Sequence, residues 1–232
     1  MVDWERTLAA AIYLEPDHIS CYGLKVEPNT PLSLRVEEGL ELPDGDAQAD
    51  LYLRAVDLLS RFNYRQYETS NFARPGKESR HNTKYWMGQE YVGFGPGAHS
   101  YFHGRRFSYV RDLEAYICGI PAQENLLEEN QTITPPERAR EYLLLRMRTR
   151  RGIEEWEYRR TFGLNFEPIS HKLELFERYH WVEQSDRRWH FTPEGFLLSN
   201  TLILDLLDAQ SGTLSECKDW KNWIHPHGSN PD

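Results

Sequence analysis

The sequence has few cysteines, and none of them lie close together. The three cysteines, Cys21, Cys118 and Cys217, show neither the CxxC nor the CxxxCxxC spacing of zinc sites and iron–sulfur clusters. The residues themselves therefore predict no such motif. A sparse and odd cysteine count is typical of proteins in a reducing compartment, so we expect a cytoplasmic protein.

Long apolar runs and an excess of basic residues are also missing. No apolar run approaches the roughly 18 residues of a membrane span, and residues 1–18 lack the basic and apolar regions of a signal peptide. The formal net charge is −9, whereas general nucleic-acid-binding proteins are usually basic. We therefore expect no nucleic-acid partner. The hydrophobic content of 39% is enough for a packed core.

The first 70 residues show the pattern helix, strand, helix, strand. Apolar spacing predicts a helix over 3–14, a buried strand over 18–24, a helix that starts with Asp46 as its N-cap, and a strand over about 65–70. This alternation is typical of an α/β protein with a parallel sheet. Between them, residues 25–46 are expected to form a long polar loop.

The second half of the chain is mainly helical in pattern. After a strand near 105–110 and a helix near 112–119, the pattern predicts three helices, a two-stranded hairpin and a closing helix, an arrangement that resembles a winged helix. Residues 121–134 are polar and without periodicity, which is typical of a linker. We therefore divide the chain into an α/β part at 1–120, a linker at 121–134, a winged-helix-like part at 135–208 and a flexible tail at 209–232.

The candidate ligand site lies between residues 67 and 101, where the motif HNTKYW is expected in a loop. A neutral His81 imidazole could ligate a haem iron, and Tyr85 and Trp86 could offer flat apolar faces to the macrocycle. His81 could equally bond a backbone carbonyl in a turn, with the two aromatic residues in the core. A single histidine is weak evidence for a ligand, so the residues alone leave both interpretations open.

Polar residues at the end of the second strand have two interpretations as well. Tyr67, Glu68, Ser70 and Asn71 could bind the polar parts of a cofactor, because ligands of α/β sheets lie beyond the carboxyl ends of the strands. They could also make hydrogen bonds to the next loop.

The segment GFGPGA at 93–98 formally matches GxGxxA, but the residues after it do not open a helix, so we reject a dinucleotide site. Its glycines instead indicate that the backbone passes close to a ligand or to another strand. His99 and His103 would form a metal pair only on a helix, which Gly104 disfavours.

Three blocks resemble a known family. HISCYGLKVEPNTPL at 18–32, QYETSNFARPGKESRHNTKYW at 66–86 and EYVGFGPGAHSY at 90–101 are similar to the C-terminal part of the radical S-adenosylmethionine haem chaperones of the HemW family. These chaperones are similar to oxygen-independent coproporphyrinogen III oxidase. The resemblance covers roughly residues 3–207. It implies the C-terminal part of a radical SAM partial (β/α)6 barrel, followed by a helical, winged-helix-like HemN C-terminal domain.

The resemblance also implies roles for individual residues. His81 matches the histidine of the HNxxYW motif and is the expected haem ligand, with Asn82, Tyr85 and Trp86 completing the motif. Gly23 and His99 fall where related oxidases line the S-adenosylmethionine site. The CxxxCxxC motif that holds the family's [4Fe–4S] cluster is absent. We therefore expect a fragment that cleaves no S-adenosylmethionine alone and whose partners include the missing N-terminal barrel half.

The expected function is that of a haem chaperone, which binds haem and passes it to acceptor haemoproteins. Peripheral membrane association through those acceptors is a further expectation. Two alternatives stay open: a fragment of a coproporphyrinogen III oxidase of porphyrin biosynthesis, and a winged-helix-like interaction module.

Overall fold

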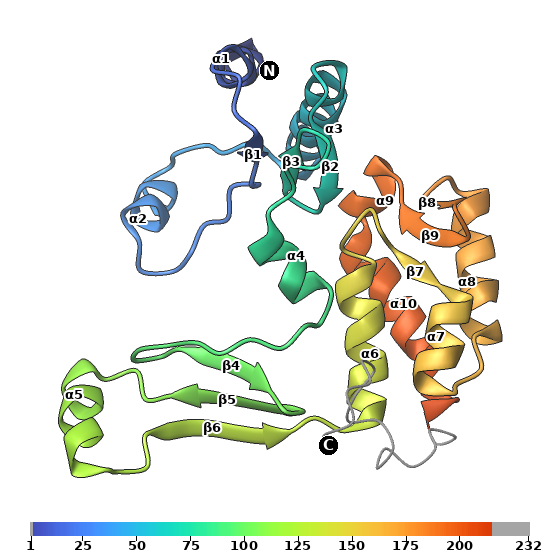
Figure 1. Ribbon diagram of the computed structural model, residues 1–232. Coiled ribbons are helices and arrows are strands. Elements are labelled where there is room, and N and C mark those ends of the chain that lie inside the picture. Colours follow the sequence, from blue (N-terminus) through green and yellow to red (C-terminus); the bar gives the residue numbers. More distant parts are fainter. Residues whose placement is uncertain (1, 215–232) are drawn as a thin grey trace.

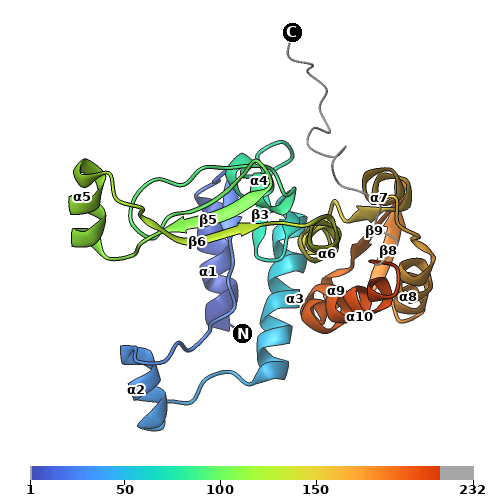
Figure 2. The same ribbon diagram turned by 90° about the horizontal axis from the view of Figure 1, so that it is seen from below.

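The computed structural model describes residues 2–214 and has three groups of elements (Figure 1). An α/β group comes first, an antiparallel sheet with one helix projects from it, and a mainly helical group follows. Figures 1 and 2 both show the projecting sheet reaching away from the C-terminal helices. Most of the expected tail, with Cys217, lies outside the described residues, and residues 209–211 belong to the last helix.

The α/β group packs two helices against a small sheet. Buried Leu8, Ala55 and Leu59 from the helices meet Tyr64 and Phe72. The elements are α1 (Val2–Tyr13), β1 (His18–Ser20), α2 (Pro31–Glu37), α3 (Gly45–Arg61), β2 (Arg65–Glu68), β3 (Asn71–Ala73) and α4 (Arg80–Trp86).

The expected parallel pairing is wrong in this sheet. β3 lies between β1 and β2 and pairs antiparallel with both, so that Phe72 faces Ile19 on one side and Gln66 on the other. The chain reverses directly after β2, which lets β3 form a hairpin and places Phe72, with no exposed surface, in the centre of the sheet. β1 and β2 therefore run in the same direction without pairing.

Two boundaries in this group also differ from the predictions. The polar loop at 25–46 contains α2, which Thr30 caps and Pro31 opens. The strand expected over 18–24 ends at Ser20. The N-cap of α3 is Asp44 and not Asp46, because the Asp44 carboxylate accepts a hydrogen bond from the backbone N of Ala47 at 2.8 Å.

The projecting sheet has the order β4-β5-β6, with all strands antiparallel. It comprises β4 (His99–Phe102), β5 (Arg105–Tyr109) and β6 (Leu127–Thr132), and α5 (Leu113–Ala122) connects β5 to β6. The prediction of a linker at 121–134 is therefore wrong where β6 pairs with β5. The strand lacks an apolar pattern because its side chains after Leu127 are exposed, while backbone hydrogen bonds hold it in the sheet.

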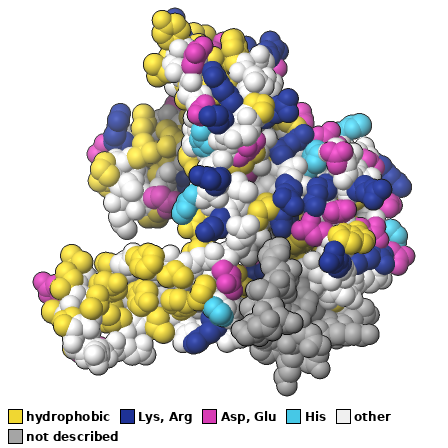
Figure 3. All heavy atoms as spheres, viewed as in Figure 1, with side chains coloured by type: hydrophobic (Ala, Val, Ile, Leu, Met, Phe, Trp, Pro, Cys, Tyr) yellow, Lys and Arg dark blue, Asp and Glu magenta, His cyan; other side chains and the backbone are white. Residues whose placement is uncertain are grey.

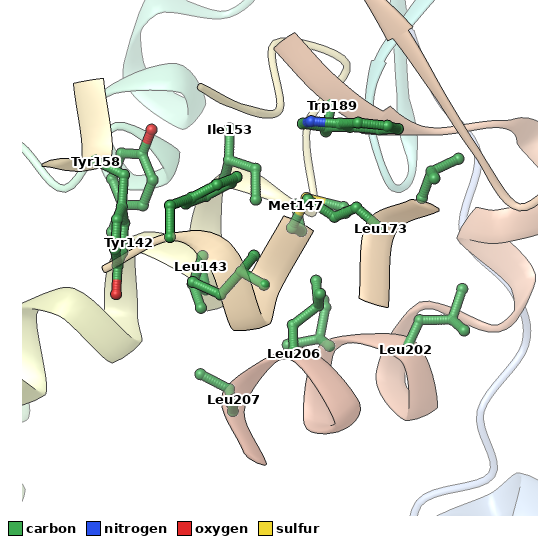
Figure 4. Packing of buried hydrophobic residues seen from close by; sticks show 14 of the residues in the cluster. Tyr142, Leu143, Met147, Ile153, Tyr158, Leu173, Trp189, Leu202, Leu206 and Leu207 are labelled. Carbon is green, nitrogen blue, oxygen red and sulfur yellow. The ribbon is translucent and has the colours of Figure 1, made fainter. Parts of the chain in front are cut away.

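The C-terminal group confirms the predicted three helices and hairpin, whereas the predicted single closing helix is divided into two at Leu198. Its elements are α6 (Pro135–Arg146), β7 (Ile153–Glu154), α7 (Glu155–Phe162), α8 (Glu167–Arg178), β8 (Val182–Ser185), β9 (Arg188–Phe191), α9 (Pro193–Leu197) and α10 (Ser199–Ser211). The short strand β7 was not predicted; it joins the hairpin in the order β7-β9-β8. Figure 4 shows Leu143, Met147, Ile153, Leu173 and Leu206 in the buried core between the helices and this sheet.

Backbone hydrogen bonds join the α/β group to the C-terminal group. The N–H of Thr69 donates to the carbonyl of Arg148 at 3.1 Å, and the N–H of Arg150 donates to the carbonyl of Tyr67 at 3.0 Å. The chain after α6 thus returns to the end of β2 and continues the sheet pattern there.

Candidate functional site

The HNTKYW motif forms the helix α4 and not the expected loop. The hydroxyl of Ser79 accepts a hydrogen bond from the backbone N of Asn82 at 3.2 Å and caps the helix. His81 is exposed, and its ring meets the ring of Tyr85 edge-on with the centroids 4.9 Å apart. The two residues are four apart, so they share one face of the helix. Tyr85 in turn contacts Tyr91 at 4.6 Å.

The N-terminal end of α4 is anchored to the sheet. The hydroxyl of Tyr67 lies 2.9 Å from Nε2 of His18, and the nearby side chain of Asn82 and backbone of Ser79 act to lower its pKa. Burial raises the pKa of Tyr67 and lowers the pKa of His18, so the contact joins a neutral phenol to a preferentially neutral imidazole. The start of α4 therefore lies next to the end of β2.

The C-terminal end of α4 is held by two arginines of α6. The guanidinium of Arg146 contacts the sulfur of Met87, and that of Arg138 donates to the carbonyl of Gly88 at 3.5 Å. Arg138 also bonds the hydroxyl of Tyr101 on β4. The helix that presents His81 is thus fixed at both ends by different parts of the chain.

The other two predicted site residues lie elsewhere. Gly23 lines an open cleft of about 800 Å³, between the start of α3, Ser70 and the C-terminal helices α9 and α10. His99 begins β4, and its Nδ1 lies 4.0 Å from a carboxylate oxygen of Glu129 on β6. Among the described residues that line the cleft, neither His81 nor His99 occurs. The cleft that Gly23 lines is therefore not the surface on which His81 is exposed.

The polar residues after β2 make hydrogen bonds within the protein. Oδ1 of Asn71 accepts from the hydroxyl of Ser20 at 2.5 Å, and the buried carboxylate of Glu68 accepts from the N–H of Ser70 at 3.3 Å. Of the two interpretations, the contacts favour hydrogen bonding between strand ends. Burial raises the pKa of Glu68.

The raised pKa of Glu68 predicts a pH dependence of stability. Between the unfolded-state pKa of about 4.3 and the higher folded-state pKa, the folded protein binds more protons than the unfolded chain, so the free energy of unfolding falls as the pH rises. Glu68→Gln should flatten this part of the profile. Urea unfolding at a series of pH values from 4 to 8, for both proteins, measures the difference. Parallel profiles would mean that Glu68 does not titrate differently on folding.

The glycine segment confirms the predicted close approach of two backbones. A Cβ atom on Gly93 would lie 2.4 Å from the carbonyl oxygen of His99, and Tyr91 makes an antiparallel bridge with Tyr101. Residues 91–93 therefore lie against β4. A strand and not a helix follows the GxGxxA segment, which agrees with the rejection of a dinucleotide site.

The described part of the chain contains no cluster of metal-binding side chains. Within residues 2–214, no group of three or more His, Cys, Asp or Glu side chains is placed to hold a metal ion. The described cysteines, Cys21 and Cys118, lie in different parts of the fold. No helix in the same range is both long and apolar enough to cross a membrane.

Comparisons with known proteins place this fold in a class. Residues 133–198 match the model of the HemN C-terminal domain family. The solved structure of coproporphyrinogen III oxidase (HemN) from Escherichia coli, a radical SAM enzyme, superposes with a TM-score of 0.64 and 17% identity over 88% of this chain and 50% of that one. The chain therefore has the fold of the C-terminal part of the HemN-type radical SAM proteins, as the sequence predicted.

The sequence relatives point to one group of proteins within this class. Proteins named haem chaperone HemW from Synechocystis, Bacillus subtilis and Escherichia coli K12 are 31%, 30% and 31% identical over 89%, 86% and 84% of this chain. The chain spans about half the length of these relatives, 55%, 53% and 51%. It is thus similar to the C-terminal half of the HemW haem chaperones, which confirms the predicted resemblance.

Proposed function

We propose that this chain is the haem-handling portion of a haem chaperone of the HemW type, which binds haem beside α4 and passes it to acceptor haemoproteins. Relatives of that name support the proposal. The observation that carries it is the exposed imidazole of His81, which stands beside Tyr85 on a helix fixed at both ends. Because the helix is held at both ends, the His81 imidazole has a fixed position from which it can coordinate the iron of a haem.

The chemistry of the site suits transfer. One imidazole with an open face gives moderate and reversible coordination, whereas two buried ligands would retain the haem. The rings of Tyr85 and Tyr91, whose centroids are 4.6 Å apart, provide an aromatic surface next to His81. Trp86 is half-buried at the end of the same helix, and we propose that it borders the macrocycle. We propose that Asn82, the next residue after His81 in the motif, also borders the haem.

S-adenosylmethionine and the iron–sulfur cluster, unlike haem, need residues that this chain does not contain. S-adenosylmethionine and the [4Fe–4S] cluster would be held mainly by the first half of the family fold, with Gly23 and His99 contributing from this half. We propose that this first half is one partner and that acceptor haemoproteins are others. The cytoplasm, with peripheral membrane association through membrane-bound acceptors, is the proposed location.

A haemin titration followed by visible absorbance tests the proposal. We expect a saturable Soret change with the wild-type chain and an affinity at least about tenfold lower for His81→Ala, since one coordinate bond is lost; tenfold is about 1.4 kcal/mol. The matched control is His171→Ala, an exposed histidine on α8, which should bind as the wild type does.

The titration also has outcomes that contradict the assignment. Equal binding by the wild type and His81→Ala would move the ligand elsewhere, and His99→Ala would be the next variant. No Soret change with any protein would require the same titration in the presence of the first half of the fold. If that also gave none, the chaperone proposal would be wrong.

The two alternatives have less support. The fold is shared with coproporphyrinogen III oxidase, but a likeness at 17% identity concerns the fold alone. A DNA-binding winged helix is disfavoured by the exposed Glu167, Glu174 and Glu177 on α8, because carboxylates repel phosphates. If the chain bound DNA and the binding weakened steeply with added salt, the DNA-binding alternative would be favoured instead.

A further inference from the structure

One face of the projecting sheet is partly covered by α6, and the opposite face, although Ser100 on it is buried, carries the exposed Phe102. Because strand side chains alternate, Tyr101 and Arg106, which are register partners, point to the same face. There the guanidinium of Arg106 bonds Glu141 of α6 at 2.8 Å, and that of Arg138 lies 4.9 Å from the ring centroid of Tyr101. Helix α6 thus covers this face.

The opposite face carries aromatic side chains. Phe102 and Phe107 lie on it, because each is the chain neighbour of a residue on the covered face: Phe102 follows Tyr101, and Phe107 follows Arg106. The rings of Phe107 and Tyr109 have centroids 6.1 Å apart, and Tyr109 contacts Tyr116 of α5 at 5.9 Å. The aromatic row therefore runs from β4 across β5 to α5.

Helix α5 extends this surface with an aliphatic stripe. Leu113, Ile117 and Ile120 are 58%, 58% and 54% exposed, and the spacing i, i+4, i+7 puts them on the side of the helix next to Tyr116. Figure 3 shows the hydrophobic side chains gathered over this lobe. We call the row and the stripe together the aromatic face. Contiguous apolar surfaces above a few hundred Å² are typical of binding sites.

The charges along α5 and β6 are mainly negative, although Arg111 precedes the N-cap of α5 and Arg105 lies beside Phe102. No Lys or Arg occurs between residues 112 and 137, whereas acids at both ends of α5 and at the start of β6 are exposed: Asp112, Glu114, Glu124 and Glu128. An anionic lipid surface would be repelled by this rim, since interfacial helices carry Lys and Arg beside their apolar stripe. Two copies joined by the same face would bring acid against acid. Apolar anchors flanked by basic residues complement it.

We propose that the aromatic face binds a protein partner through a segment that combines apolar side chains with Lys and Arg. Tyr91 bridges to Tyr101 on β4 and contacts Tyr85 on α4, so α4 lies toward the other face of the sheet, the one that α6 covers. The docking itself does not depend on haem, so its test and the haemin titration can succeed or fail separately.

The probe is a fluorescein-labelled amphipathic peptide of leucine and lysine, with leucine at i, i+3, i+4 and i+7, measured by fluorescence anisotropy against the full chain. We expect binding that weakens at least about tenfold in Ile117→Ser/Ile120→Ser, since burial of each side chain supplies a comparable factor. Leu204→Ser, which removes an equally exposed apolar side chain from α10, is the matched control and should bind unchanged.

A charge exchange gives a second readout. Glu114→Lys/Glu124→Lys should weaken the leucine–lysine peptide and strengthen a matched leucine–glutamate peptide. The proposal is overturned if the isoleucine variant binds as tightly as the wild type, or if both peptides bind the wild type equally. It is also overturned if sedimentation shows a dimer that the isoleucine variant abolishes, or if vesicles with anionic lipid bind the wild type but not that variant.

Discussion

Replacing Gly195 with alanine is expected to unfold the C-terminal group of elements. Gly195 lies in α9, and a Cβ atom there would be 1.8 Å from the carbonyl oxygen of Trp181. That oxygen is backbone and already accepts a hydrogen bond from Thr192 at 3.0 Å, so it cannot move aside alone. We expect a loss of more than about 4 kcal/mol in the free energy of unfolding, measured by urea denaturation.

Gly212→Ala is the matched control, because Gly212 also lies at a helix end. No heavy atom is within 4 Å of its added Cβ, and its φ of −65° suits alanine. Its free energy of unfolding should change by less than about 1 kcal/mol. A Gly195→Ala protein as stable as the wild type would show that α9 does not pack against Trp181 as described.

Removing the carboxylate of Glu157 should have the second largest effect. Its two oxygens accept from the guanidinium of Arg146 at 3.2 Å and from that of Arg188 at 2.8 Å, and all three side chains are largely buried. Burial lowers the pKa of Arg146, which shows that its charge is costly without a partner. Glu157→Ala should lose about 3 kcal/mol in urea denaturation.

The same helix provides the control. Glu155 pairs with Arg159 at 2.8 Å, but both side chains are half exposed. Glu155→Ala should cost no more than about 0.5 kcal/mol, because water and salt screen the pair. Similar losses for the two variants would mean that burial does not distinguish the two ion pairs. Since Arg146 also contacts Met87, Glu157→Ala is expected to loosen α4 as well.

The sequence predicted the C-terminal group well for physical reasons that are visible in its residues. The helices there have buried stripes such as Ile169, Leu173 and Phe176, and caps such as Thr192. The missed elements are short and carry no periodicity: α4 has seven residues, and β7 has two. The antiparallel pairing of β3 could not be predicted, because an apolar Phe72 after a short strand is compatible both with the second strand of a hairpin and with a loop.

The site was predictable only in part. His81 stood out by its residue type beside two aromatic residues, and the resemblance to the chaperones singled it out. The residues that hold α4 in place did not stand out, because they come from distant parts of the sequence. His18 lies 49 residues from Tyr67, and Arg146 lies 59 residues from Met87. Arginines on a helix carry no local signal of such a contact.

The two backbone hydrogen bonds between the end of β2 and the chain after α6 have a consequence for synthesis on the ribosome. Thr69 and its partner Arg148 are 79 residues apart in the chain. At about 5–20 residues per second, the end of β2 leaves the ribosome roughly 4–16 s before its partner is made. During that interval Thr69 and Tyr67 have backbone groups without these partners. The nascent chain therefore passes through a stage in which this strand end can pair with another polypeptide.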